Sequence, residues 1–248
     1  MVDAVTDPEG EADAFASETL LRLANCFLCY SAPRDAPAVA PPPSLKTGFI
    51  TFGSFNNPTK LSAATLDVWA KLLGSLPDAR LLLKGRPFAD ATVRASFLHR
   101  LMDRNVSVDR VELLAWTPSW IAHLALYDRI DIALDPFPYN GTTSTCEALW
   151  MGVPVVTHRS DRHAGRVGAS LLTQVGLTDL IADSTAEYLE IATSLARNPT
   201  ELNNLRLSLR SRVATSPLCD APRFAIQIES AYRAMWRRWV ANTEQTIK

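Results

Sequence analysis

Short apolar runs recur between residues 49 and 182, and longer amphipathic stretches separate them. Each run is almost continuously apolar, which is typical of a strand that helices cover on both faces. Runs and amphipathic stretches that alternate in this way indicate βαβ units. The predicted strands are Phe49–Phe55, Arg80–Lys84, Arg110–Ala115, Ile130–Leu134, Pro154–Thr157 and Leu180–Ala182. The pattern therefore predicts an α/β domain with a doubly wound parallel sheet.

The amphipathic stretches between the strands predict helices, and Ser62 is a favourable N-cap for the first of them. These helices are Ala63–Leu76, Asp90–Asp103, Ser119–Tyr127, Thr143–Met151 and Arg166–Val175. After Ser184 the apolar runs stop, and three further helices are predicted at Thr185–Ala196, Pro199–Ala214 and Pro222–Ala241. The domain is therefore expected to end in a helical tail.

The last predicted helix carries an apolar stripe. Its members follow one another at steps of three and four, which aligns them on one helix face: Phe224, Ile228, Tyr232, Met235 and Trp239. Such a stripe is expected to pack on another surface. The other side carries Arg233, Arg237 and Arg238, which we interpret as a solvated basic face near the helix C-terminus.

Prolines dominate the stretch from Pro33 to Pro43. Proline removes amide donors and favours extended backbone, so this stretch is expected to be a linker or a crossing between domains. Before it, Glu18–Leu23 suggests a short helix or strand. We expect residues 46–248 to form the α/β domain, with residues 1–45 as a separate preceding segment.

The charges nearly cancel, with 25 Lys and Arg against 26 Asp and Glu, so the chain has no broad field to attract a polyanion. Nucleic acid is therefore not an expected partner. A membrane is not expected either, because no window approaches the roughly 18 apolar residues of a spanning helix. The first ten residues are acidic, unlike a signal peptide. Cys26 and Cys29 have the spacing of a zinc half-site but no second pair, so we interpret them as buried small residues and expect no metal. These features favour a cytoplasmic protein.

The segment after the strand at 130–134 is the most informative for function, and it reads DPFPYNGTTSTCEALW from Asp135 to Trp150. Asn140 and Gly141 allow a tight turn before four hydroxyl residues open a helix. The hydroxyl run comprises Thr142, Thr143, Ser144 and Thr145. Amides and hydroxyls at the positive end of a helix dipole form a phosphate cradle. Glu147 could then accept a ribose hydroxyl; the alternative is an ordinary capped helix.

Three other polar side chains follow predicted strands. Lys60 follows the first strand, and an ammonium there could balance a diphosphate charge. His123 follows the third strand and could stack on a base or bond to a phosphate. His163 follows the fifth strand and is a further candidate, although an exposed loop histidine is more often solvated. Ligands of open parallel sheets bind at the carboxyl ends of the strands, so these segments are expected to converge.

Four segments carry a resemblance to a known family: FGSFNNPTK, ALDPFPYNGTTSTCEALWMGVPVVT, RHAGRVGASLL and SPLCDAPRFAIQIESAYRAMW. Over residues 49–239 the chain resembles the C-terminal catalytic domain of the O-GlcNAc transferase family, including the plant Spindly-type protein O-fucosyltransferases. The resemblance implies half of a glycosyltransferase-B fold, Rossmann-like, that binds a nucleotide sugar. It also implies inverting, metal-independent transfer of a sugar to Ser or Thr hydroxyls of acceptor proteins, with no cofactor.

The same resemblance assigns roles to individual residues. Lys60 matches the lysine that contacts the donor diphosphate and is the expected catalytic residue, and Asn57 lies where animal O-GlcNAc transferases have a glutamine. His123 matches the histidine that packs on the base. Within the hydroxyl-rich helix, Thr143 and Ser144 match two threonines that bind phosphate in the family. Glu147 matches an acidic residue that binds ribose.

Two departures bear on the donor. Thr142 stands where animal O-GlcNAc transferases have a histidine, and Trp120 stands where they have a lysine. UDP-GlcNAc is the expected donor. GDP-fucose is the alternative, because the sequence GTTSTCE is closer to the corresponding segment of the Spindly branch.

The family's tetratricopeptide repeats and N-terminal catalytic half have no counterpart in this sequence. Residues 1–45 then correspond to the end of that first half and the crossing between halves, and the missing parts become expected partners. A non-catalytic module that binds a nucleotide sugar remains a second alternative.

Overall fold

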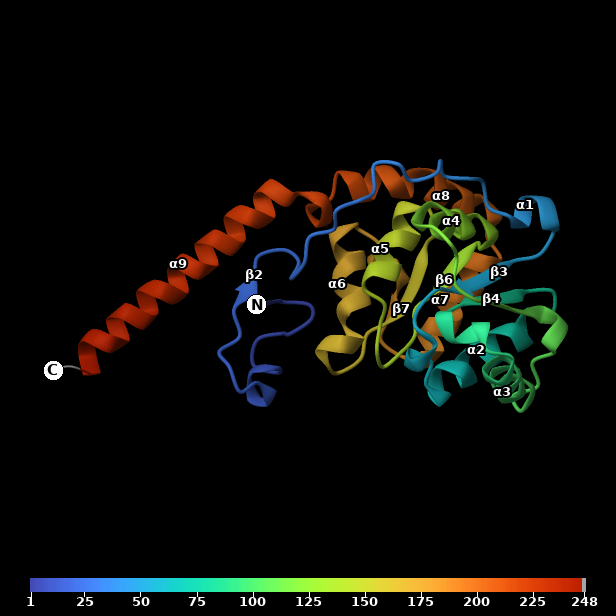
Figure 1. Ribbon diagram of the computed structural model, residues 1–248, viewed down its shortest axis with the longest axis horizontal. Coiled ribbons are helices and arrows are strands. Elements are labelled where there is room, and N and C mark those ends of the chain that lie inside the picture. Colours follow the sequence, from blue (N-terminus) through green and yellow to red (C-terminus); the bar gives the residue numbers. More distant parts are fainter. Residues whose placement is uncertain (247–248) are drawn as a thin grey trace.

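The computed structural model describes residues 1–246, and six parallel strands form its main sheet (Figure 1). The strands are β3 (Thr51–Ser54), β4 (Arg80–Lys84), β5 (Val111–Leu114), β6 (Ile132–Leu134), β7 (Val155–His158) and β8 (Ile181–Ala182). Their order across the sheet is β5-β4-β3-β6-β7-β8. The chain thus builds outwards first to one side of β3 and then to the other, which confirms the predicted doubly wound sheet. The order reverses between β3 and β6, where such sheets bind ligands.

Helices cover both faces of this sheet, as the sequence predicts (Figure 1). Around the strands they are α2 (Ala63–Ser75), α3 (Ala91–Met102), α4 (Trp120–Ala125), α5 (Thr143–Trp150) and α6 (Val167–Gln174), followed by α7 (Thr185–Ala196), α8 (Pro199–Ala214) and α9 (Ala221–Thr246). Ser62 accepts a hydrogen bond from the Thr65 amide and caps α2 as expected. Every predicted helix is present with ends shifted by a few residues, except that α9 is longer.

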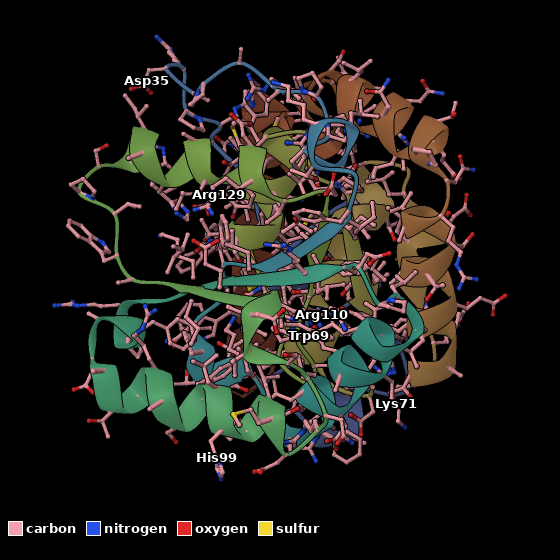
Figure 2. All side chains as sticks on the ribbon, turned by 90° about the vertical axis from the view of Figure 1, so that its right-hand side faces the viewer. Asp35, Trp69, Lys71, His99, Arg110 and Arg129 are labelled. Atoms are coloured by element: carbon pink, nitrogen blue, oxygen red, sulfur yellow. The ribbon has the colours of Figure 1, made fainter. Side chains whose placement is uncertain are left out.

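Buried aromatic side chains join the sheet to the helices around it. Trp69 on α2 is fully buried, and Figure 2 shows it in the interior while Lys71 lies at the surface. The Trp69 indole donates to the Tyr188 hydroxyl at 3.2 Å, and that hydroxyl donates to the Asp135 carbonyl at 3.2 Å. The core therefore supports the carboxyl end of β6 from beneath.

The N-terminal segment adds a small parallel pair, β1 (Val2–Asp3) with β2 (Arg22–Leu23), so the predicted short element near residue 20 is a strand. Asp3 is fully buried and accepts hydrogen bonds from the Phe27 amide and the Ser170 hydroxyl. The latter bond fastens the segment to α6. The proline-rich residues 33–43 then cross the body without a helix or strand and reach α1 (Ser44–Thr47) (Figure 1).

Helix α9 extends away from the body (Figure 1). Phe224 and Ile228 near its start are half-buried, whereas Tyr232 is 61% exposed. Trp236 and Trp239 stack on each other with ring centroids 5.2 Å apart, and both are exposed. Burial of the predicted apolar stripe is therefore seen for its first two members, Phe224 and Ile228. The three arginines predicted to form a solvated face, Arg233, Arg237 and Arg238, are exposed. No helix within residues 1–246 has the length and apolarity to cross a membrane.

Arg206 on α8 clamps the proline-rich segment to the sheet. Its side chain is fully buried and donates to the carbonyls of Ala40, Ile130 and Tyr127 at 2.5, 2.8 and 3.1 Å. These carbonyls come from the crossing segment and from the turn that leads into β6. Burial of a guanidinium is costly, and three carbonyl acceptors offset that cost.

We expect Arg206→Met to lower the free energy of unfolding by about 3 kcal/mol or more, because it removes three buried hydrogen bonds. Urea denaturation followed by circular dichroism measures the change. Arg237→Met, at an exposed position of α9, is the matched control and should be near neutral. A loss in Arg206→Met below about 1 kcal/mol would contradict the clamp.

Candidate functional site

The candidate site lies at the carboxyl ends of β3, β4 and β6, beside the start of α5. Its floor is the loop after β6, which the buried Asp135 carboxylate holds in place. One carboxylate oxygen accepts from the Gly141 amide at 2.6 Å, and the other accepts from the Thr157 hydroxyl on β7 at 2.7 Å. Burial raises the pKa of Asp135 to about 7, while these hydrogen bonds and the Lys60 charge oppose that rise. The loop is thus tied to β7 by a carboxylate that titrates near neutrality.

Asn140 fixes the same loop from the inside. Its side chain donates to the Pro136 carbonyl at 2.9 Å and accepts from the Gly168 amide at 3.2 Å. Its backbone amide donates to the Ala164 carbonyl at 2.8 Å. Every one of these bonds joins a backbone group to a buried residue, so the loop has a defined shape before any ligand binds.

Gly141 permits a close approach between the first strand end and α5. A Cβ there would lie 2.6 to 2.8 Å from the side-chain oxygens of Thr145, Ser144 and Asn56. The Ser144 hydroxyl donates to the Asn56 amide oxygen at 2.8 Å, which joins the two segments. Only glycine fits at this position without displacing that bond.

The start of α5 presents unshared amides beside this glycine. The first helical hydrogen bond runs from the Cys146 amide to the Thr142 carbonyl, so the amides of Thr143, Ser144 and Thr145 precede the helical ladder. The Thr142 side chain makes no capping bond, and Thr143 is exposed. Amides and hydroxyls at a helix N-terminus can bind anions, so the structure has the open helix start that the predicted phosphate cradle needs, and phosphate binding there stays a prediction. We call residues 141–145 the cradle.

Lys60 lies next to the cradle, at the end of the 3-10 turn Pro58–Lys60. Its ammonium donates to the Asn140 carbonyl at 2.7 Å and lies 3.8 Å from the centre of the Tyr139 ring. Burial lowers the pKa of Lys60, and the nearby Asp135 raises it. The carbonyl and the aromatic face hold the ammonium beside the helix start, where a diphosphate would meet both.

A second polar group forms around His123. Its Nε2 lies 2.8 Å from a Glu147 carboxylate oxygen, and its Nδ1 lies 2.8 Å from the Lys84 ammonium. The buried Tyr127 hydroxyl donates to the same Glu147 oxygen at 3.1 Å. These contacts join the end of β4, helix α4 and helix α5, so the predicted residues His123 and Glu147 do converge. Beside them is a hollow of about 350 Å³ lined by Lys84, Trp116, Thr117, Pro118, Ser119, Trp120 and His123.

Two predicted residues lie at the margin. Asn57 is exposed and accepts from the Thr59 amide, so it caps the 3-10 turn, and Asn56 is the amide that reaches the cradle. His163 Nδ1 lies 2.6 Å from the Asp7 carboxylate, and its ring meets the Phe27 ring edge-on. The structure therefore places His163 against the N-terminal segment, one residue from the Ala164 carbonyl that anchors Asn140.

Sequence reasoning missed Asn56, Lys84 and Tyr139. A signal was present for Lys84, because it ends a predicted strand and strand ends face the site. Among the cysteines, Cys26 is buried as predicted, Cys29 is half-buried, and both are free. No cluster of three or more metal-binding side chains occurs among residues 1–246.

Comparison with known proteins agrees with this fold. The model of glycosyl transferase family 41 matches residues 43–228. A Thermobaculum terrenum O-GlcNAc transferase mutant superposes with a TM-score of 0.88 at 38% identity, over 96% of this chain and 44% of that one. A Staphylococcus aureus TarM structure, at 13% identity and a TM-score of 0.56, shares the fold alone. The fold is thus that of one half of a glycosyltransferase-B enzyme.

The chain belongs to glycosyl transferase family 41. It is 46% identical over 239 residues to a protein of Solanum lycopersicum named probable UDP-N-acetylglucosamine–peptide N-acetylglucosaminyltransferase SPINDLY. A Caenorhabditis elegans UDP-N-acetylglucosamine–peptide N-acetylglucosaminyltransferase is 29% identical over 191 residues. The chain spans 26% of the first relative's length and 16% of the second's.

Asp135 gives a pH prediction. Its pKa of about 7 in the folded protein exceeds the value of about 3.9 expected in the unfolded chain, so the folded state binds the proton more tightly. Stability from this group is therefore present at low pH and lost as the pH rises from about 4 through 7. Asp135→Asn removes the titration. The unfolding free energy of the wild type minus that of the variant should therefore fall as the pH rises from 5 to 8. Parallel pH profiles from urea denaturation would contradict the assignment.

Proposed function

We propose that this chain is the donor-binding part of a glycosyltransferase that transfers a sugar from a nucleotide to Ser or Thr hydroxyls of proteins. UDP-GlcNAc is the proposed donor. The observation that carries the proposal is the Lys60 ammonium, held 2.7 Å from the Asn140 carbonyl beside the open N-terminus of α5. The names of the plant and nematode relatives and of the bacterial structure support the same donor class.

In this proposal the cradle and Lys60 bind the donor diphosphate. Negative charge grows on the diphosphate as the bond to the sugar breaks, and an ammonium and a helix N-terminus lying in place stabilise that charge without reorganisation. The proposed transfer is inverting and metal-independent, with Lys60 as the residue that contacts the leaving group. Preorganisation of Lys60 by Asn140 and Tyr139 means that little entropy is lost when the diphosphate binds.

The His123 group would hold the nucleoside. Both hydrogen bonds to Glu147 use one carboxylate oxygen, which leaves the other as an acceptor for a ribose hydroxyl. The base would then lie in the neighbouring hollow, where Trp116 and Trp120 are 69% and 45% exposed. Aromatic faces of this kind stack on any base with little preference among the bases.

In this proposal the acceptor side of the reaction uses parts of the fold outside the described residues. The chain spans 44% of the solved bacterial enzyme. In the proposed glycosyltransferase-B reaction the acceptor would enter between this half and a second one. We propose that the N-terminal half provides the acceptor site and the general base. The exposed aromatic residues of α9 are a surface that such a half could cover.

GDP-fucose is the second candidate donor. The sequence is 46% identical to a plant SPINDLY relative but 29% identical to the nematode enzyme, and Thr142 and Trp120 replace donor-side residues of the animal branch. A module that binds a nucleotide sugar without independent catalysis also fits the isolated half. Calorimetric titration with UDP, GDP, UDP-GlcNAc and GDP-fucose, with and without magnesium, distinguishes the two donors, and silence from all four would contradict the proposal. Only an assay of sugar transfer separates the non-catalytic module from an enzyme, because both bind the nucleotide sugar.

Lys60→Met should weaken UDP or GDP binding at least about tenfold and leave binding of the free nucleoside unchanged, because only the diphosphate contact is removed. In a complete enzyme the variant should lose transfer. Calorimetry with nucleotide and nucleoside gives the two affinities, and Lys71→Met at the exposed surface is the matched control. Equal weakening of nucleoside and nucleotide would instead indicate a general structural role for Lys60.

A further inference from the structure

Lys84 is an ammonium at the carboxyl end of β4 that the proposed function leaves without a role. It is half-buried, its Nζ lies 2.8 Å from His123 Nδ1, and it lines the hollow that contains Trp116 and Trp120. Burial lowers the pKa of Lys84, and the nearby Glu147 carboxylate raises it. Partial burial of an ammonium costs free energy, so Lys84 is expected to have a role other than that of a surface lysine, which only keeps the protein soluble.

The partners of His123 fix its protonated nitrogen. An ammonium has only donors and a carboxylate has only acceptors. His123 therefore donates from Nε2 to Glu147 and accepts at Nδ1 from Lys84, as the neutral imidazole with its hydrogen on Nε2. One Lys84 hydrogen is used in this contact, and the other two remain for the hollow that Lys84 lines.

The hollow is large enough for a ligand group, at about 350 Å³, and is mostly aromatic and small polar in lining. Its stacking faces do not distinguish bases, because every base has a π-face. Lys84 is the side chain in this lining that carries an ammonium, and it offers hydrogen-bond donors only. Selection among bases by hydrogen bonding is therefore expected to depend on it.

We propose that Lys84 determines which nucleobase the site accepts, by donating a hydrogen bond to an exocyclic carbonyl oxygen. Uracil and guanine present such an oxygen, whereas cytosine and adenine present an amino group in the corresponding place. An amino group would face the ammonium donor to donor and leave both groups unpaired. The site would thus favour UDP or GDP over CDP and ADP. This inference rests on the proposed function, since it requires the base to occupy the hollow.

Two substitutions separate selection from mere support. Lys84→Met removes the donors while keeping an unbranched side chain, so affinity for the carbonyl base should fall at least about tenfold and approach that for CDP and ADP. Lys84→Gln supplies an amide that both donates and accepts, so it should retain the carbonyl base and gain affinity for CDP. Lys71→Met is the surface control.

Calorimetric titration of the four nucleoside diphosphates against wild type and the three variants gives the result. Loss of discrimination in Lys84→Met together with gain of CDP in Lys84→Gln supports the inference. An equal fall for all four nucleotides would overturn it and assign Lys84 to structural support. Wild type that binds all four equally would overturn the inference but keep the nucleotide site, whereas wild type that binds none would overturn the proposed function as well.

A measurement on the unliganded protein tests the underlying geometry. Nitrogen-15 NMR should show His123 as the tautomer protonated on Nε2 in wild type and lose that preference in Lys84→Met. His123→Gln assigns the signal among the four histidines of the chain. A His123 protonated on Nδ1 in wild type would contradict the hydrogen bond from Lys84 and with it the selection mechanism.

Discussion

The two hydrogen bonds of the Asp135 carboxylate are the constraint on which the rest of the site depends. They hold the Gly141 amide and the Thr157 hydroxyl in fixed relation, which joins the loop after β6 to β7. Helix α6 also packs directly on this carboxylate, since a Cβ on Gly168 would lie 2.4 Å from an Asp135 carboxylate oxygen. The carbonyl that positions Lys60 belongs to this same loop. One buried carboxylate therefore sets the relative positions of the cradle, the lysine and two flanking elements.

The site balances its charges in pairs. Lys60 lies near Asp135, and Lys84 lies near Glu147 through His123. Each ammonium is partly desolvated and each carboxylate is buried, so removing either partner would leave a costly isolated charge. A diphosphate brings further negative charge to the end of the site that holds Lys60 and the helix start. The second pair is already neutral overall, which suits an uncharged nucleoside.

Periodicity and strand-end reasoning predicted most of the fold and the centre of the site. Short apolar runs place the strands because only a sheet covered on both faces needs them, and the rule for open parallel sheets brings Lys60, His123 and the cradle together. The choice between Asn56 and Asn57 lay beyond the sequence, because it depends on which amide faces inward after a four-residue strand. Periodicity alone could not predict the exposure of α9 either. An apolar stripe predicts that one helix face is buried. It does not predict whether the surface that buries it belongs to the described residues.

Strand order also gives the site a direction. Lys84 ends β4, Lys60 follows β3, the cradle follows β6, and His163 follows β7, so these groups succeed one another along the sheet. A nucleotide whose base lies beside Lys84 and whose diphosphate lies in the cradle would therefore direct its sugar toward the β7 side. There the Asp7 carboxylate orients His163 through Nδ1, and Nε2 is left as the free ring nitrogen of a histidine that is 41% exposed. The donor-binding role of His163 stays a prediction, in which this residue would lie at the sugar end of the site and the N-terminal segment packed on α6 would hold it there.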